Sequence, residues 1–325
     1  MSADTGTARP GVAARLHDWF FAPVPLARIA LLRLAVFAFV ILDVLRLHTS
    51  GYYHGWADPV WYEPLKIGQL LHLPAASVPL VVLLKWGCVV AAAAAMTGRA
   101  PRLLGWATAL AWCWYQYIAF AYGKVDHDRT DFVVALLLLP TVGAAHLSDR
   151  RRSEAAGWAI RCVQLITIAT YFFSGWAKLR FGGIGWVNSA TLTRAVVRRG
   201  TELGDALLHV PHLMHVSQYL IITAELLSPL IFFVPERLRR LMVAGWYGFH
   251  VMVYATIKIA FWPHLIVLLA FLPLEDYRNA LADRWRRLRA AEPDRAHDRS
   301  VDSGAGTEQA GVPPGSHDRF RATQR

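Results

Sequence analysis

The chain has 325 residues, of which 55% are hydrophobic and 18% are charged, whereas about 25% of the residues in soluble globular domains are charged. This composition argues against a soluble enzyme. The formal net charge of +11 suggests a nucleic-acid partner at first sight, but the arginines stand in short bursts between apolar runs, as is typical of the cytoplasmic flanks of membrane helices. We therefore expect a lipid bilayer, and no nucleic acid, as the partner.

Apolar runs of the length that crosses a bilayer, about 20 residues, recur along the chain. We therefore predict an all-α fold, a polytopic integral membrane helix bundle with about eight transmembrane helices. The expected ranges are Pro25 to Leu47, Val78 to Thr97, Leu103 to Gly123, Phe132 to Leu147, Ala155 to Ala177, Leu213 to Val234, Leu241 to Ile257 and Ile259 to Leu274. Only Lys258 and a break at Pro263 separate the last two runs, so a re-entrant final run would reduce the count to seven.

The distribution of positive charge predicts the orientation of these helices. Lys and Arg concentrate near the N-terminus, in alternate connections and in the C-terminal stretch, and such residues favour the cytoplasmic side. We expect a multi-pass protein of the cell membrane with both termini cytoplasmic. The domains would be a cytoplasmic N-terminal segment at 1–24, a transmembrane domain at 25–274 and a basic, disordered cytoplasmic tail at 275–325.

Two segments between the apolar runs are not expected to cross the bilayer. The segment Thr49 to Ser77 is dense in Tyr and Trp and contains three prolines. The segment Gly185 to Arg199 alternates apolar residues with Asn and Arg. Aromatic and amphipathic stretches of this kind lie along membrane surfaces, and the charge distribution places both on the outer side.

Charged residues inside apolar runs need partners, because an unpaired charge at membrane depth is costly. Arg33 and Asp43 lie on the first predicted helix, ten residues and about 15 Å apart, so each requires a partner on another helix. Arg28 stands near the end of the same helix, where its long side chain can reach the surface. Lys85 lies inside the second run and is expected to form a structural pair or to serve the function.

Two further ionisable residues lie near the outer ends of the predicted helices. His127 stands between Asp126 and Asp128, and flanking carboxylates suit an imidazole to acid-base chemistry; a solvated turn is the alternative. Lys178 follows an aromatic-rich run, where burial would favour the neutral amine that a general base requires. Snorkelling of Lys178 to the interface is the alternative reading.

The later apolar runs contain Glu225 and His250 near their middles, and a carboxylate at that depth needs a neutralising partner. His209, His212 and His215 recur at three-residue spacing without a nearby carboxylate, so no metal site is expected. The three cysteines lie far apart in apolar runs, without the spacing of a zinc site or a disulfide framework. They are Cys88, Cys113 and Cys162.

Several motifs stand in a fixed order in the second half of the chain. They are Tyr171-Phe-x-x-Gly175-x-x-Lys178-Leu179, then Trp186-Val187, then Phe249-His250 and the run that ends at Pro263. Together they resemble the horizontally transferred transmembrane (HTTM) domain. This membrane domain is shared by vitamin K-dependent gamma-glutamyl carboxylases and many bacterial proteins of unassigned activity. The similarity covers roughly residues 25–274.

The resemblance implies a quinone-dependent membrane enzyme, similar to a carboxylase or epoxidase, with an outward-facing site. Lys178 matches the lysine that deprotonates reduced vitamin K in the carboxylases. His127 would assist it as acid or base, although the family carries an Asn-His pair where this chain has Asp126-His127. Glu225, His250 and Trp186 would line the pocket for a cofactor such as reduced vitamin K or menaquinone, and the substrate would be small or a peptide.

The chain also departs from the carboxylases, which append a large extracytoplasmic domain that grips a propeptide. Here the predicted transmembrane domain is followed only by a short basic tail, so peptide carboxylation is in doubt. A second interpretation therefore stays open, namely a non-catalytic membrane scaffold or carrier whose charges form interhelical pairs. Resemblance of fold does not choose between the two, because function depends on the site.

Overall fold

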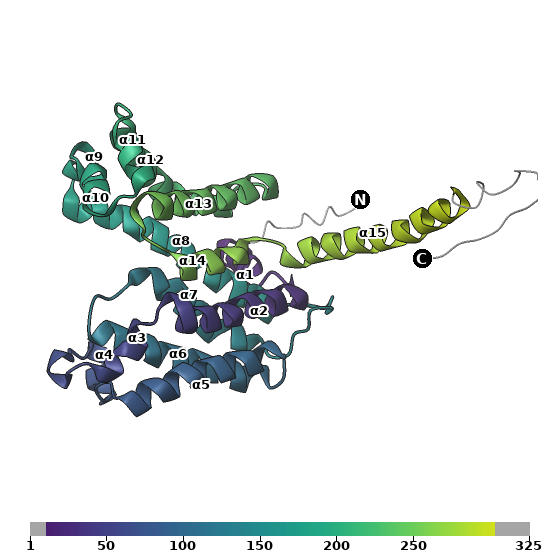
Figure 1. The fold of residues 1–325 in the computed structure, drawn as a ribbon, viewed down its shortest axis with the longest axis horizontal. Coiled ribbons are helices and arrows are strands. Elements are labelled where there is room, and N and C mark those ends of the chain that lie inside the picture. Colours follow the sequence, from purple (N-terminus) through teal and green to yellow (C-terminus); the bar gives the residue numbers. More distant parts are fainter. Residues whose placement is uncertain (1–10, 303–325) are drawn as a thin grey trace, which may run out of the picture. The chain divides into compact units, whose positions relative to one another are not determined.

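The computed structural model describes residues 11–302, with side chains through residue 289. Helix accounts for 78% of the structure, which confirms the all-α prediction (Figure 1). The two described strands, β1 (Val24–Pro25) and β2 (Arg152–Ser153), pair antiparallel with Val24 opposite Ser153. This short pairing holds together two points of the chain that immediately precede long helices.

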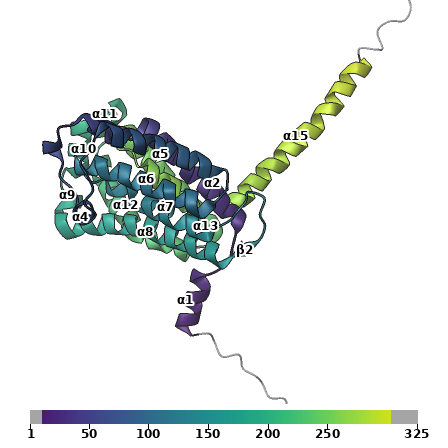
Figure 2. The ribbon, with the colours of Figure 1, turned by 90° about the horizontal axis from the view of Figure 1, so that it is seen from below.

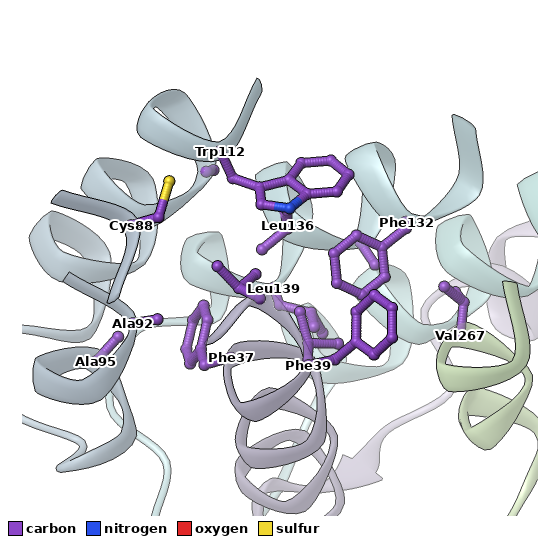
Figure 3. Close-up of a cluster of buried hydrophobic side chains, with 14 of the residues drawn as sticks. Phe37, Phe39, Cys88, Ala92, Ala95, Trp112, Phe132, Leu136, Leu139 and Val267 are labelled. Carbon is purple, nitrogen blue, oxygen red and sulfur yellow. The ribbon is translucent and has the colours of Figure 1, made fainter. Parts of the chain in front are cut away.

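The first group of helices encloses the larger apolar core. Its members are α2 (Leu26–Leu42), which continues into the π-helical turn η1 (Asp43–Leu47), α5 (Val78–Met96), α6 (Pro101–Ala121) and α7 (Thr130–Leu138). Figure 3 shows Phe37 and Phe39 of α2 beside Trp112 of α6 and Phe132 of α7. The Phe132 ring lies 5.1 Å from each of Phe39 and Trp112 between centroids, so these aromatic contacts join three helices.

The second group packs around the long helix α8, beside α7 (Figure 2). Its members are α8 (Glu154–Gly182), α12 (Leu213–Leu227) with η6 (Ser228–Phe232), α13 (Glu236–Ile257) and α14 (Trp262–Leu268) with η7 (Leu269–Phe271). A smaller core that includes Ile168, Tyr171, Val243 and Leu268 joins α8, α13 and α14. The single helix α8 therefore contacts both groups.

Short helices occupy the two segments that the sequence assigns to the membrane surface. The first contains α3 (Ser50–Tyr53), η2 (His54–Trp56), η3 (Pro59–Trp61) and α4 (Lys66–Leu70). The second contains α9 (Gly185–Asn188) and α10 (Thr191–Arg199), and α11 (Glu202–Leu208) follows it. Figures 1 and 2 both place these short helices at the same end of the long ones. Trp56 and Trp61 are exposed there.

Within residues 11–302, three helices are long and apolar enough to cross a membrane, namely Val78–Met96, Glu154–Gly182 and Leu213–Phe232. The expected count of about eight is not confirmed. The predicted runs at 132–147 and 259–274 fold into α7 and α14, which have nine and seven residues. After α7 the chain forms the short turn η5 (Leu139–Val142), because Pro140 has no amide hydrogen with which to continue the helix.

The N-terminal segment contains the helix α1 (Val12–Phe20). At the other end, the tail expected to be disordered from residue 275 instead forms α15 (Leu274–Asp302); that expectation is wrong for this stretch. The tail is rich in Ala, Leu and Arg, which favour helix, and Arg286 pairs with Asp283 one turn away. The expectation for residues 303–325, like that for residues 1–10, lies outside the described residues.

Asp43 forms a buried ion pair that joins three elements. Its carboxylate, with no exposed surface, accepts hydrogen bonds from both Nη atoms of Arg129 at 2.8 and 3.1 Å. It also accepts bonds from Trp112 Nε1 and Gln116 Nε2 of α6, each at 3.0 Å. The prediction that Asp43 requires a partner on another element is confirmed.

The arginines of α2 are also held by distant parts of the chain. Arg33 donates to the backbone carbonyls of Leu139 and Gly143, which hold its guanidinium group in place, but no carboxylate among the side chains of residues 11–289 pairs with it. Arg28 forms a bidentate pair with Glu275, with its Nη2 and Nε 2.6 and 2.9 Å from the carboxylate oxygens. This ion pair fixes the beginning of α2 against the beginning of α15.

Replacing Asp43 with Ala is expected to lower the free energy of unfolding by about 3–5 kcal/mol, because loss of one partner leaves a buried charge uncompensated. Denaturant unfolding of the purified protein measures this change. Glu236→Ala serves as the control, since Glu236 pairs with Arg239 and Arg240 while its side chain is 44% exposed, and exposed pairs contribute at most about 1 kcal/mol. Equal losses in the two variants would show that the Asp43 pair does not hold the helices together.

Candidate functional site

The structure joins two of the predicted site residues, Lys178 of α8 and Glu225 of α12, in an ion pair. Lys178 Nζ lies 2.5 Å from Oε1 and 2.7 Å from Oε2 of Glu225. Lys178 Nζ also donates to Ser174 Oγ at 2.8 Å, and Ser174 Oγ lies 3.3 Å from Glu225 Oε1. The partner that the Glu225 carboxylate requires at this depth is therefore Lys178.

A glycine on α8 makes room for this pair. A Cβ atom at Gly175 would lie 3.0 Å from Cβ and 3.3 Å from Oε2 of Glu225. Such distances are shorter than most contacts of a real Cβ atom, so a side chain at position 175 would push α12 and its carboxylate away. The Gly175 of the sequence motif thus has a packing role that positions Glu225 against Lys178.

The pair is open on the lysine side. The side chain of Lys178 is 24% exposed, whereas that of Glu225 is 6% exposed. The indole ring of Trp186 on α9 lies beside the amine, with 5.5 Å between Lys178 Nζ and the ring centroid, a distance that permits a cation-π interaction. A small molecule could therefore reach Nζ without first displacing Glu225.

Gln218 of α12 fixes the backbone around Trp186. This buried side chain donates to the carbonyls of Trp186, Val187 and Ser189 at 2.7 to 3.2 Å and accepts from the amide of Leu192 at 2.8 Å. Four hydrogen bonds from one buried amide tie the α9–α10 segment to the helix that carries Glu225. The sequence analysis did not single out Gln218, and its position inside an apolar run was the available signal.

His250 lies in a second polar cluster rather than in the Lys178 pair. His250 Nε2 is hydrogen-bonded to the hydroxyl of Tyr171 at 2.8 Å, and the Tyr171 ring stacks on Trp246 with 3.7 Å between centroids. Tyr171, Ser174 and Lys178 follow one another at spacings of three and four residues, so they share one face of α8. The two clusters are about 10 Å apart along that helix.

The second cluster also contains a buried pair that the sequence analysis missed. Asp131 of α7, with no exposed surface, and His264 of α14, 2% exposed, are joined by 2.6 Å between Oδ2 and Nδ1. The His264 ring lies edge-on to Tyr171, with 4.5 Å between centroids, and 5.3 Å from the His250 ring. Asp131 borders one apolar run and His264 lies inside another, which was the signal that could have identified them.

His127 belongs to the turn η4 (His127–Arg129), which packs beside α14. Its side chain is exposed and interacts electrostatically with the Glu225 carboxylate. Within the described part of the chain, no hydrogen bond joins the His127 imidazole to the Lys178 pair. The structure thus brings Lys178, Glu225 and Trp186 together, places His127 within electrostatic range and sets His250 apart.

Among the side chains that the structure describes, no group of three or more His, Cys, Asp or Glu residues could hold a metal ion. His209 Nδ1 is hydrogen-bonded to the carbonyl of Asp205, and the His215 ring lies edge-on to Tyr219. His209 and His215 therefore make separate local contacts. The three cysteines are free thiols.

Comparison of the chain with protein-family models, with curated proteins and with solved structures gave no match. The resemblance to the HTTM domain therefore stays a prediction from the sequence motifs.

Replacing Gly175 with Leu is expected to destabilise the protein by about 1–3 kcal/mol, because the added side chain overpacks the contact with Glu225. Thermal unfolding of the purified protein measures the loss. Gly248→Leu on α13 is the matched control, since a Cβ atom there would have no neighbour within 4 Å and the change is expected to be close to neutral. Similar stabilities for the two variants would contradict the close approach of α8 and α12.

Proposed function

We propose that this chain is a multi-pass membrane enzyme of the HTTM type whose Lys178–Glu225 pair moves protons for a quinone-type cofactor. The observation that carries the proposal is the ion pair itself. A buried carboxylate holds an amine that is still 24% exposed, and the amine stands beside an aromatic ring. Perturbed, partly accessible charge pairs of this kind are common at functional sites.

The membrane part of the proposal is supported by where the apolar surface lies. The candidate membrane helix α5 buries only 28% of its most apolar window inside the protein. Its outward residues include Leu83, Trp86 and Val90, each more than half exposed. Lipid would cover such a face. We propose about eight crossings, with both termini and the arginine-rich connections on the cytoplasmic side.

In this proposal Lys178 is the base. When the proton of the pair resides on Glu225, the Nζ atom has a free electron pair. Once Nζ has taken up a proton from the cofactor and Glu225 has released its own proton, the Glu225 carboxylate stabilises the ammonium ion that has formed. The 2.5 Å contact between Nζ and Oε1 provides the route by which a proton moves between the two groups. Ser174, which contacts both, keeps them aligned.

The residues around Nζ fit a flat, lipid-soluble ring with polar oxygens. Trp186 provides an aromatic face, and Phe181, 84% exposed, lies one turn after Lys178 on α8. A reduced quinone of the vitamin K or menaquinone class would supply a weakly acidic hydroxyl and reducing equivalents. Trp186 and Glu225 would hold and orient it, His127 would assist proton exchange from the exposed side, and His250 would bound the site through Tyr171.

One observation favours a second candidate function, a non-catalytic scaffold or carrier. Four ion pairs with a buried partner join different helices or turns: Lys178–Glu225, Arg129–Asp43, Arg28–Glu275 and His264–Asp131. Pairs of this kind also fix the packing of membrane helices. A protein that uses all four only for packing would bind no quinone.

The Lys178→Arg variant separates the two functions. Arginine keeps the positive charge but effectively does not deprotonate, so the oxygen-dependent conversion of a reduced quinone is expected to fall by about 100-fold to 10,000-fold. The assay uses purified protein with reduced vitamin K or menaquinol, and His127→Ala is expected to give a smaller loss. Lys85→Arg is the control, since Lys85 contacts the Tyr52 ring outside the proposed site.

Full activity of Lys178→Arg beside an active wild type would disprove the assignment of the base. If the wild type neither binds nor converts a quinone, the scaffold function is favoured, and the variant would then differ only in thermal stability.

The proposed orientation is tested by cysteine labelling. In a variant whose three native cysteines are replaced by Ala, single cysteines are introduced at Val60, 75% exposed in η3, and at Ser316 in the tail. A membrane-impermeant thiol reagent applied from outside is expected to label position 60 in intact cells and position 316 only after permeabilisation. Labelling of both positions from the same side would contradict the proposed topology.

A further inference from the structure

A cavity of about 310 Å³ lies where α5 ends and α6 begins, against α2 and the segment before β2. Its wall includes apolar side chains such as Phe37, Met96 and Pro101. The polar side chains Arg33, Thr97, His146 and Ser148 also line it. The volume is within the range of small-molecule sites, and the lining combines an apolar surface with one buried cation.

The buried cation is Arg33, which is 6% exposed. Its Nε and Nη2 atoms donate to the carbonyl of Leu139, and Nη1 donates to the carbonyl of Gly143 at 2.7 Å. These neutral acceptors position the guanidinium group but do not cancel its charge. A full charge at this level of burial is stable only if something compensates it.

A second guanidinium group lies close by and increases the demand for a counter-ion. Arg102 repels Arg33 electrostatically, and a Cβ atom at Gly143 would lie 3.3 Å from Arg102 Nη2. Both guanidinium groups therefore lie next to Gly143. Neither is paired with a carboxylate among the side chains of residues 11–289.

The carboxylate that follows the cavity lining in the chain is already engaged. Asp149 follows Ser148 in the chain and pairs with Arg151, at 2.7 Å between Oδ2 and Nη2. It also accepts hydrogen bonds from the backbone amide and Nε of Arg151. An external anion is therefore the group that would neutralise Arg33 and Arg102, and the fork of a guanidinium group suits the oxygens of a phosphate.

The position and walls of the cavity indicate what carries the phosphate. The cavity lies at the end of the candidate membrane helix Val78–Met96, the level at which lipid headgroups stand. We propose that it binds the phosphate group of an anionic membrane lipid, with Arg33 as the cationic contact in the wall, the apolar wall against the lipid backbone, and the charge of Arg102, which lies outside the lining, adding to the attraction. This site is separate from the Lys178 site and does not depend on its activity.

The test is native mass spectrometry of the full-length protein, purified in neutral detergent and titrated with phosphatidylglycerol, phosphatidylcholine or glycerol 3-phosphate. The wild type is expected to retain phosphatidylglycerol in clear preference to phosphatidylcholine. Arg102→Gln is expected to weaken that retention about tenfold, since it removes the positive charge that acts together with Arg33. Arg102 is exposed, so the variant is expected to fold, and a thermal melt checks this.

Two further variants distinguish a built site from general attraction to positive charge. Arg237→Gln removes the same charge from an exposed position at the start of α13 and is expected to leave retention unchanged. Ala30→Leu narrows the cavity without changing any charge and is expected to weaken retention. Equal retention of the two lipids, or equal losses in Arg102→Gln and Arg237→Gln, would overturn the proposal. Binding of glycerol 3-phosphate as tight as that of phosphatidylglycerol would overturn the lipid as the source of the phosphate.

Discussion

The carboxylate of Asp43 organises much of this structure, because it accepts four hydrogen bonds from three side chains on two other elements while fully buried. An unpaired charge in that position would be untenable, so α2, α6 and the turn before α7 must come together around it. Arg129 is thereby fixed at the beginning of α7, and two residues later Asp131 reaches His264 of α14. A series of contacts thus connects Asp43 in the first helix group, through Arg129, Asp131 and His264, to the ring of Tyr171 on α8.

The contacts around Tyr171 connect this polar network to the candidate site on α8. Tyr171 is held by contacts with His264, His250 and Trp246, and Lys178 lies two turns further along the same face of α8. The structure therefore divides the predicted site residues into an inner cluster around Tyr171 and an outer pair with Glu225. Of these two groups, only the outer pair is partly exposed. An external molecule would therefore exchange protons with Lys178 before it reached the inner cluster.

The sequence predicted the positions of several long helices because each long apolar run can be recognised on its own. For example, α5 begins at Val78, as expected, and ends within one residue of the expected position. Contacts between runs are a different matter. Lys178 and Glu225 were each identified as needing an explanation, but they stand 47 residues apart in the sequence. Nothing in the sequence shows that they meet, because that depends on how α8 and α12 cross.

Two other differences have equally local causes. Asp131 escaped notice because a single ionisable residue at the edge of an apolar run has the same pattern as a helix end. His264 lies inside an apolar run, but only the fold shows that both residues are buried and paired. The stretch after Glu275 was expected to be disordered because it is highly charged, yet its Ala, Leu and Arg content favours helix. Composition alone does not distinguish a disordered segment from an exposed helix, since both can contain many charged residues.

The pairing of β1 with β2 has a topological consequence. Because β1 leads directly into α2 and β2 directly into α8, these two helices start at the same end of the bundle, and Figures 1 and 2 show both running toward the short helices. The chain must therefore reverse direction an even number of times between them. The helices α5 and α6 are two passes in opposite directions, so α6 ends far from the start of α8. One more pass is needed to bring the chain back, and it consists of α7, η5 and the segment up to β2. A helix of only nine residues thus sets the direction of every helix that follows.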